Sequence, residues 1–189
     1  ADGPLVCRTG QHTGRSPNDK FIVKDAESDQ HVHWGKVNRP MSPEHFAALR
    51  AEVVAHLGQR ELFVQDLHAG ADPTYRLPVR IVSQKAWHSL FAHTMFLKNT
   101  TLDQARHHVP GFTIIAAPGF QANPMADGTR SETFIVLNFR QKLGIIGGTG
   151  YAGEIKKTVF TVLNYLLPLE GVLSMHCSAT ADKESGNSS

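Results

Sequence analysis

Residues 132–168 read ETFIVLNFRQKLGIIGGTGYAGEIKKTVFTVLNYLLP, a pattern that predicts two strands, a glycine-rich turn and a helix. The runs ETFIVLNF (132–139) and LGIIG (143–147) are short and apolar, which is typical of buried strands. Residues 154–167 are apolar over a wide arc, so this helix should be buried and should end at Pro168. Such a strand–turn–helix unit indicates an α/β fold.

The rest of the chain alternates strands and helices irregularly, which favours a single α/β unit with a mixed β-sheet and flanking helices. The other expected strands are 5–10, 20–25, 61–67, 75–83, 112–118 and 171–179. The other expected helices are 43–57, 83–98 and 101–108. Residues 43–57 should bury Phe46, Leu49, Val53 and Leu57, and residues 83–98 should bury Trp87, Leu90, Phe91 and Met95.

The composition is that of a globular protein, since 41% of the 189 residues are hydrophobic and 19% are charged. The net charge of +2 is too small to imply a nucleic-acid or membrane partner, so any anion recognition must be local. The two cysteines, Cys7 and Cys177, fit a reducing compartment better than a disulfide framework. Neither an apolar run of the roughly 18 residues that span a membrane nor a signal sequence is found, so we expect a cytoplasmic protein.

Two adjacent lysines, Lys156 and Lys157, stand where the predicted helix begins, although the helix dipole is already positive there. Burial, the neighbouring charge and the helix end would each lower a lysine pKa from about 10.4, which suits a base or a metal ligand. A lysine that stays charged would bind a phosphate or carboxylate, helped by the backbone N–H groups of the glycine-rich turn. The alternative is that both lysines face solvent. The turn is not a nucleotide P-loop, because Glu154 stands where that loop requires a lysine.

Two further segments carry candidate site residues. In TGRSPND, Arg15 lies in a turn-rich loop, where its guanidinium could bind a carboxylate through two hydrogen bonds. In SMHCSAT, His176 could ligate a metal, but its partners must come from elsewhere because a zinc-type Cys/His cluster is absent from the sequence. The alternatives are a solvated loop arginine and a half-buried structural histidine.

Taken together, the order TGRSP, SETFIVLNF, IIGGTGYAGEIKK, NYLLP and GVLSMHCSA resembles phosphoenolpyruvate carboxykinase of the ATP-dependent class. The resemblance covers essentially the whole chain and implies that residues 1–189 form the amino-terminal, oxaloacetate-binding domain of that fold. Members of the family are carboxy-lyases of gluconeogenesis that convert oxaloacetate and ATP into phosphoenolpyruvate, ADP and carbon dioxide. They use Mg²⁺ with the nucleotide and Mn²⁺ at the active site. The family's P-loop nucleotide domain is absent from this chain and is expected downstream, so the chain alone should be inactive.

The resemblance also implies a role for each matching residue. Arg15 would hold the substrate carboxylate or the departing carbon dioxide, and Tyr151 would pack on the substrate or hydrogen-bond it. Lys156 would contact the phosphoryl group in transfer. Lys157 and His176 would ligate Mn²⁺, with Lys157 as the free amine, and both would also contact ATP. Lys157 would in addition contact the substrate.

The chain departs from the family pattern at two of these segments. Asn18 replaces a lysine that is usual in the family, which should weaken the local attraction of anions. Gly150 replaces a residue that is often larger, which should loosen the wall near Tyr151. Two other functions stay open at this stage. One is a stand-alone module that binds dicarboxylates or phosphate anions through Arg15 and the turn 147–153 without catalysis, and the other is a structural or regulatory remnant.

Overall fold

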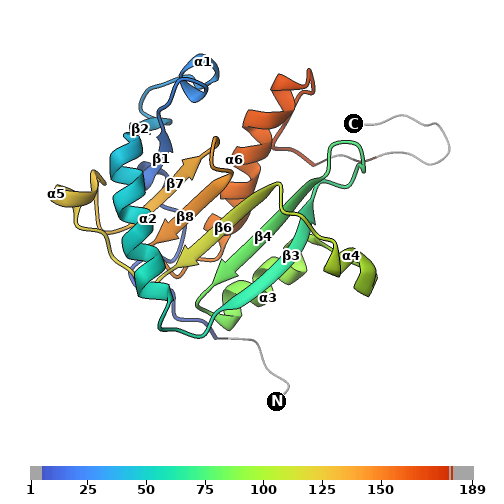
Figure 1. The fold of residues 1–189 in the computed structure, drawn as a ribbon, viewed down its shortest axis with the longest axis horizontal. Helices are drawn as coiled ribbons and strands as arrows, with labels where there is room; N and C mark the ends of the chain where they lie inside the picture. Colours follow the sequence, from blue (N-terminus) through green and yellow to red (C-terminus); the bar gives the residue numbers. More distant parts are fainter. Residues whose placement is uncertain (1–5, 179, 181–189) are drawn as a thin grey trace.

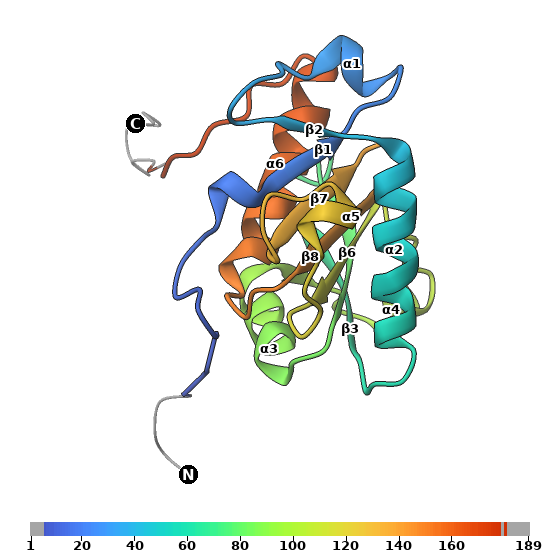
Figure 2. The same ribbon diagram turned by 90° about the vertical axis from the view of Figure 1, so that its left-hand side faces the viewer.

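The computed structural model, which describes residues 6–178 and 180, has one mixed sheet of eight strands with helices on both faces (Figures 1 and 2). Across the sheet the strands run in the order β2-β1-β7-β8-β6-β4-β3-β5. Neighbours pair in parallel except β7 with β8, β3 with β4 and β3 with β5. The strands are β1 (Lys20–Val23), β2 (Arg39–Met41), β3 (Phe63–Ala69), β4 (Leu77–Ser83), β5 (Leu97–Lys98), β6 (Phe112–Ala117), β7 (Phe134–Asn138) and β8 (Leu143–Gly147). The expected fold class is confirmed.

The helices divide between the two faces of this sheet. Figure 2 shows α2 along one face, and α3 and α6 along the other. The helices are α1 (Ser28–His31), α2 (Pro43–Leu57), α3 (Ala86–Met95), α4 (Leu102–Arg106), α5 (Pro124–Asp127) and α6 (Gly153–Leu169), and a 3-10 turn η1 covers Pro17–Asp19. The structure is therefore a three-layer α/β/α arrangement.

Strand β7 shows how the two faces are filled. Phe134 and Val136 belong to the hydrophobic cluster under α2, whereas Ile135 and Leu137 belong to the cluster under α6. None of the four is more than 2% exposed. A strand that is covered on both faces needs a continuous apolar run, and each such side chain contributes about 1.5–3 kcal/mol through burial. The central strands thus hold the helix that bears the two lysines firmly against the sheet.

The residues predicted to be buried are confirmed for α2, but the prediction for α3 is wrong in part. Phe46, Leu49, Val53 and Leu57 of α2 are all buried. In α3, however, Leu90 is 50% exposed and Met95 is 44% exposed, while His88 and Ala92 are buried. The reason is that His88 turns inward, where its Nε2 donates a hydrogen bond to the carbonyl of Gly150 (2.9 Å).

Two expected strands are wrong. Residues 6–10 and 171–178 have no sheet partner, while Leu5 and Ala179 lie outside the described residues. The first segment instead lies against the glycine turn, where Thr9 accepts a hydrogen bond from the N–H of Gly150 (3.2 Å). The second is held by α6, since Val172 donates to the carbonyl of Leu167 (2.9 Å). The backbone groups of these two segments therefore form hydrogen bonds with the glycine turn and with α6, and not with a neighbouring strand.

Two smaller expectations about elements also need correction. Pro168 does not end α6, which continues for one residue to Leu169. The run HVHW (31–34) predicts a strand with His31 and His33 on one face, but residues 28–31 form the short helix α1. Within the part of the chain that the structure describes, no helix is both long and apolar enough to cross a membrane.

The topology brings several loops to one edge of the sheet. Strands β4, β6 and β8 are parallel, so the segments that follow Ser83, Ala117 and Gly147 all leave the sheet at this edge. Strand β7 is antiparallel to β8 and therefore begins at the same edge, at Phe134. In α/β sheets the carboxyl ends of parallel strands are the usual place for ligands. The candidate site residues are found at this edge.

Candidate active site

The loop that carries Arg15 is fixed to the first turn of α6 by a buried carboxylate. Glu154 is 3% exposed, and its Oε1 accepts a hydrogen bond from the backbone N–H of Ser16 (2.6 Å). Its Oε2 lies 3.8 Å from Nε of Arg15. Negative charge in the first turn of a helix is also favoured by the helix dipole. One side chain of the lysine-bearing helix thus holds a loop that lies 138 residues earlier in the chain.

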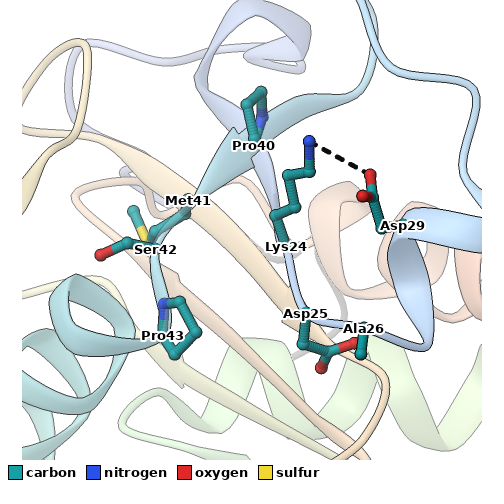
Figure 3. Close-up of a pocket in the computed structure, with 8 residues that line it drawn as sticks. All are labelled: Lys24, Asp25, Ala26, Asp29, Pro40, Met41, Ser42 and Pro43. Atoms are coloured by element: carbon teal, nitrogen blue, oxygen red, sulfur yellow. Dashed lines mark ion pairs between the residues drawn. The ribbon is translucent and has the colours of Figure 1, made fainter.

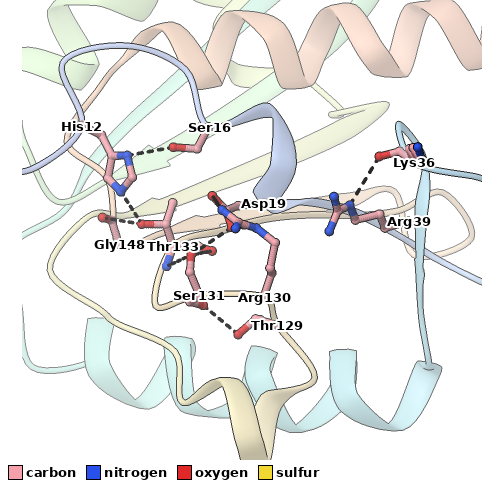
Figure 4. Close-up of polar contacts among 10 residues, drawn as sticks. All are labelled: His12, Ser16, Asp19, Lys36, Arg39, Thr129, Arg130, Ser131, Thr133 and Gly148. Carbon is pink, nitrogen blue, oxygen red and sulfur yellow. Dashed lines mark hydrogen bonds and ion pairs between the residues drawn. The ribbon is translucent and has the colours of Figure 1, made fainter.

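A chain of side-chain hydrogen bonds anchors the same loop from the other side (Figure 4). The hydroxyl of Thr133 donates to the carbonyl of Gly148 (3.0 Å), so it must accept from Nε2 of His12 (2.8 Å). With its proton on Nε2, His12 accepts through Nδ1 from the hydroxyl of Ser16 (2.9 Å). This tautomer satisfies every donor in the chain. His12 therefore ties the Arg15 loop to the turn before α6.

The end of the Arg15 loop is held by an ion pair. Asp19 in η1 is 3% exposed and accepts from Nε and Nη2 of Arg130 at 3.0 and 3.2 Å (Figure 4). The hydroxyl of Ser131 donates to the same carboxylate (2.9 Å). A two-pronged arginine–carboxylate contact fixes orientation as well as distance. Asn18 is exposed on this turn.

The glycine turn before α6 requires residues without a Cβ atom. Gly148 has a φ of +70°, and a Cβ there would lie 2.6 Å from the carbonyl oxygen of Glu132. A Cβ at Gly150 would lie 2.9 Å from Cα of Thr9, so the wall expected to be loose is filled by backbone. The carbonyl of Gly150 accepts from both Trp87 Nε1 (3.2 Å) and His88 Nε2 (2.9 Å). The turn is therefore rigidly held from three sides.

Lys157 and His176 meet beside α6. Nζ of Lys157 lies 2.7 Å from Nε2 of His176, and both side chains pack on the ring of Phe160, with Nζ 5.0 Å from its centroid. The pKa of Lys157 lies below its usual value, first because of burial and then because of the charges of Arg15 and Lys156. The structure thus brings the two expected metal ligands together and places Arg15 within electrostatic reach of them.

This pair fits a divalent ion as two of its ligands. An imidazole and a free amine are both nitrogen donors, and their nitrogens are close enough to share one ion. Among residues 6–178 and 180, no group of three or more His, Cys, Asp or Glu side chains could hold a metal.

Lys156 and Tyr151 occupy neighbouring positions with different surroundings. Lys156 is exposed and lines a groove of about 360 Å³ together with Met95 and Phe160. Tyr151 is half-buried, and its ring lies where a Cβ of Gly153 would stand. The glycine at the start of α6 is therefore needed for the position of this ring. Lys156 and Lys157 point to different sides of the helix.

Lys20 is a further cation of the site, which the sequence pattern does not single out. It begins β1 and is half-buried. Burial and the charge of Arg15 lower its pKa, and the charge of Glu154 opposes this shift. Arg15 and Lys20 thus both place positive charge near the buried carboxylate of Glu154 and repel each other. Positive charges that converge in this way favour a bound anion.

One sizeable cavity lies away from these residues. It has a volume of about 560 Å³ and is lined by residues 24–26, 29 and 40–43, with an ion pair of 3.1 Å between Lys24 and Asp29 (Figure 3). None of the candidate site residues borders it. The site is therefore identified by its charged groups and not by cavity size.

Sequence reasoning missed Glu154, His12 and Thr133 as parts of the site. Glu154 was considered only as the residue that rules out a P-loop. A signal was available, because a carboxylate between a glycine turn and two lysines is well placed to bind a cation or a backbone N–H group. His12 and Thr133 give no such signal, since their contact joins residues 121 positions apart.

Comparison with known proteins gives the family. The sequence model of one family, described as phosphoenolpyruvate carboxykinase, matches residues 1–189. Similar relatives are the proteins named phosphoenolpyruvate carboxykinase (ATP) from Geobacter sp. (strain M21), 55% identical over 182 residues, and from Thermus thermophilus, 52% identical over 185 residues. Each alignment covers 96% of this chain, but 34% and 35% of these relatives. The chain spans about a third of the length of the curated relatives it matches.

Proposed function

This chain belongs to the phosphoenolpyruvate carboxykinase (ATP) family, and on that premise we propose that it forms the amino-terminal, oxaloacetate-binding domain of an ATP-dependent carboxykinase. The whole enzyme would convert oxaloacetate and ATP into phosphoenolpyruvate, ADP and carbon dioxide, as a carboxy-lyase of gluconeogenesis in the cytoplasm. The observation that carries the proposal is the 2.7 Å contact between Lys157 Nζ and His176 Nε2, with Arg15 near enough to lower the pKa of Lys157.

Arg15 is suited to bind the carboxylate of the substrate. Its side chain is 41% exposed, and among the described residues its Nη groups make no hydrogen bond. Two free N–H donors on a planar fork match the two oxygens of a carboxylate. Tyr151, at the end of the glycine turn, would pack on the bound substrate or hydrogen-bond it. These two residues would orient oxaloacetate for loss of carbon dioxide.

Lys157 and His176 are suited to hold Mn²⁺. The lowered pKa of Lys157 makes its free amine more available, and a metal ligand must be unprotonated. The neutral imidazole of His176 supplies the second nitrogen. When bound there, the ion would act as a Lewis acid on the substrate oxygen that gains negative charge as carbon dioxide leaves. Both side chains would also contact ATP, and Lys157 the substrate.

Lys156 would contact the phosphoryl group in transfer. Its exposed ammonium lies one residue from the metal-ligand lysine and can stabilise charge on phosphate oxygens. We propose that Mg²⁺ and ATP are held by a separate P-loop nucleotide domain that follows residues 1–189 in the whole protein. The chain alone would then bind substrate but transfer no phosphoryl group.

The test compares the intact protein with residues 1–189 under the same conditions. The intact protein should form phosphoenolpyruvate from oxaloacetate only with ATP and a divalent ion, and residues 1–189 should form none. Calorimetry with oxaloacetate separates the alternative, because a stand-alone module should bind it tightly without nucleotide or metal. Such binding, together with an intact protein that shows no phosphoryl transfer, would refute the proposal.

A further inference from the structure

The buried carboxylate of Glu154 is in an unusual position for a structural residue. It is 3% exposed, yet it contacts the exposed Arg15 loop and stands three residues before Lys157 on α6. A buried charge is unfavourable unless it is paired and hydrogen-bonded. Glu154 meets this need with the N–H of Ser16 at 2.6 Å and with the surrounding cations. Its carboxylate is therefore shared between the backbone of the loop and the guanidinium of Arg15.

A comparison with another ion pair in the chain shows what is particular about this contact. Arg80 donates two short hydrogen bonds to Asp66, of 2.7 and 2.8 Å, so its guanidinium is fully engaged. Arg15 instead approaches Glu154 only through Nε, at 3.8 Å. Its terminal Nη groups make no hydrogen bond within the described residues. Glu154 therefore attracts and directs Arg15 without consuming the groups that would bind a ligand.

The contact also fixes a distance within the site. Glu154 and Lys157 lie three residues apart on one helix, which fixes their relative positions. The contact of Arg15 with Glu154 therefore also fixes the distance between Arg15 and Lys157. The chain from Ser16 through His12 and Thr133 to Gly148 supports the loop from the opposite side. The loop can therefore move little without breaking hydrogen bonds of buried groups.

We infer that Glu154 is a positioning residue, whose buried carboxylate sets the place of Arg15 relative to Lys157 and thereby the binding of the substrate carboxylate. The inference rests on the proposed function, since it acts through Arg15. It assigns to Glu154 no contact with substrate, metal or nucleotide.

The test is Glu154→Gln in the intact enzyme. Glutamine can still accept from the N–H of Ser16, but it loses the charge and can turn N–H donors toward Arg15. The KM for oxaloacetate should rise roughly tenfold, while Mn²⁺ affinity stays within about twofold. If this variant fails to fold, Glu154→Asp keeps the charge and shortens its reach, and it should also raise KM.

The readout that a merely structural role would not move is a double-mutant cycle. In an Arg15→Ala background, Glu154→Gln should have little further effect on KM, because its target is gone. The matched control is Asp66→Asn, which breaks an ion pair on the other side of the sheet and should lower stability without changing KM. Equal effects of Glu154→Gln with and without Arg15, or an unchanged KM, would overturn the inference. If Arg15→Ala itself left KM unchanged, the proposed function would fall, and the inference with it.

Discussion

Nζ of Lys157 and Nε2 of His176 lie 2.7 Å apart, although 19 residues separate them in sequence. The chain leaves α6 at Leu169, turns back and runs along the helix until the imidazole reaches the lysine. Its return is fixed by Val172, which donates to the carbonyl of Leu167, and by Ser174, which donates to Asn164 (2.6 Å). The proposed metal site thus depends on one helix and the segment that follows it.

The first prediction concerns this pair. Lys157→Ala and His176→Ala in the intact enzyme should each weaken Mn²⁺ binding by about tenfold or more, because each removes a nitrogen ligand. Titration of the ion, followed by its paramagnetic resonance signal, measures the affinity. Lys24→Ala is the control, since Lys24 pairs with Asp29 at 3.1 Å far from the site. Unchanged titrations for both site variants would exclude the assignment.

The second prediction concerns Arg15. Arg15→Ala should raise the KM for oxaloacetate by roughly 10- to 100-fold, the equivalent of the 1.5–3 kcal/mol typical of hydrogen bonds to charged groups. The affinity for Mn²⁺ should nearly be kept, because Arg15 is no ligand in the proposed site. Steady-state kinetics at saturating ATP measure the first effect. A large loss of metal affinity with an unchanged KM would contradict the role in substrate binding.

The third prediction concerns pH. A proton and a metal compete for the amine of Lys157, so Mn²⁺ affinity should increase as pH rises toward the pKa of this group and then level off. Burial, Arg15 and Lys156 place that pKa below 10.5. Lys156→Gln removes a positive neighbour and should raise the pKa of Lys157. At pH 7 the affinity should then fall about twofold, the size of an exposed like-charge effect.

The control for the pH experiment is Lys98→Gln, because Lys98 lies in β5 at the far edge of the sheet. It should leave the pH profile of Mn²⁺ binding in place. Mn²⁺ affinity that does not change as pH rises from neutral toward 10.5 in the unmodified enzyme would show that no titrating amine binds the ion.

The central strands and α2 could be predicted from the sequence pattern, whereas the edge strands of the sheet could not. The buried runs at β7 and β8 and the amphipathic pattern of α2 are local signals that survive in the structure. Strands β2 and β5 were missed because they are very short and gain their partners only when β1 and β3 are in place. The run 171–178 has a strand-like sequence, yet α6 and not the sheet is its neighbour.

The site divides in the same way. Motifs pointed to Arg15, Lys156, Lys157 and His176, because charged groups beside glycine turns are visible in a sequence. The contacts that tie the Arg15 loop to other elements were not visible, since they join residues more than a hundred positions apart, such as Glu154 with Ser16 and His12 with Thr133. Such pairings depend on how β1 and β7 are placed side by side.

The fourth prediction concerns the stability of the sheet. Hydrogen bonds from Arg80 lower the pKa of Asp66 below 3.8, so the pair stabilises the fold above pH 3.8 and loses this effect as pH falls through the lowered pKa. Asp66→Asn should cost about 1–2 kcal/mol at pH 7. The difference from the unmodified protein should shrink below pH 3.8. Chemical denaturation at pH 7 and pH 3 measures it, and an equal difference at both would contradict the ion-pair explanation.

The fifth prediction concerns Gly150, where the structure replaces an expected loose wall with packed backbone. A methyl group there would lie 2.9 Å from Cα and 3.1 Å from the carbonyl oxygen of Thr9, so residues 6–10 would have to move. Gly150→Ala should therefore cost about 1–3 kcal/mol, as overpacking usually does. Gly58→Ala is the matched control, because Gly58 has helical φ and its nearest contact to a new Cβ is 3.5 Å. If Gly150→Ala proved as stable as that control, the packing of residues 6–10 against the turn would be refuted. The hydrogen bonds from Trp87 and His88 to Gly150 would then hold the turn without a contribution from residues 6–10.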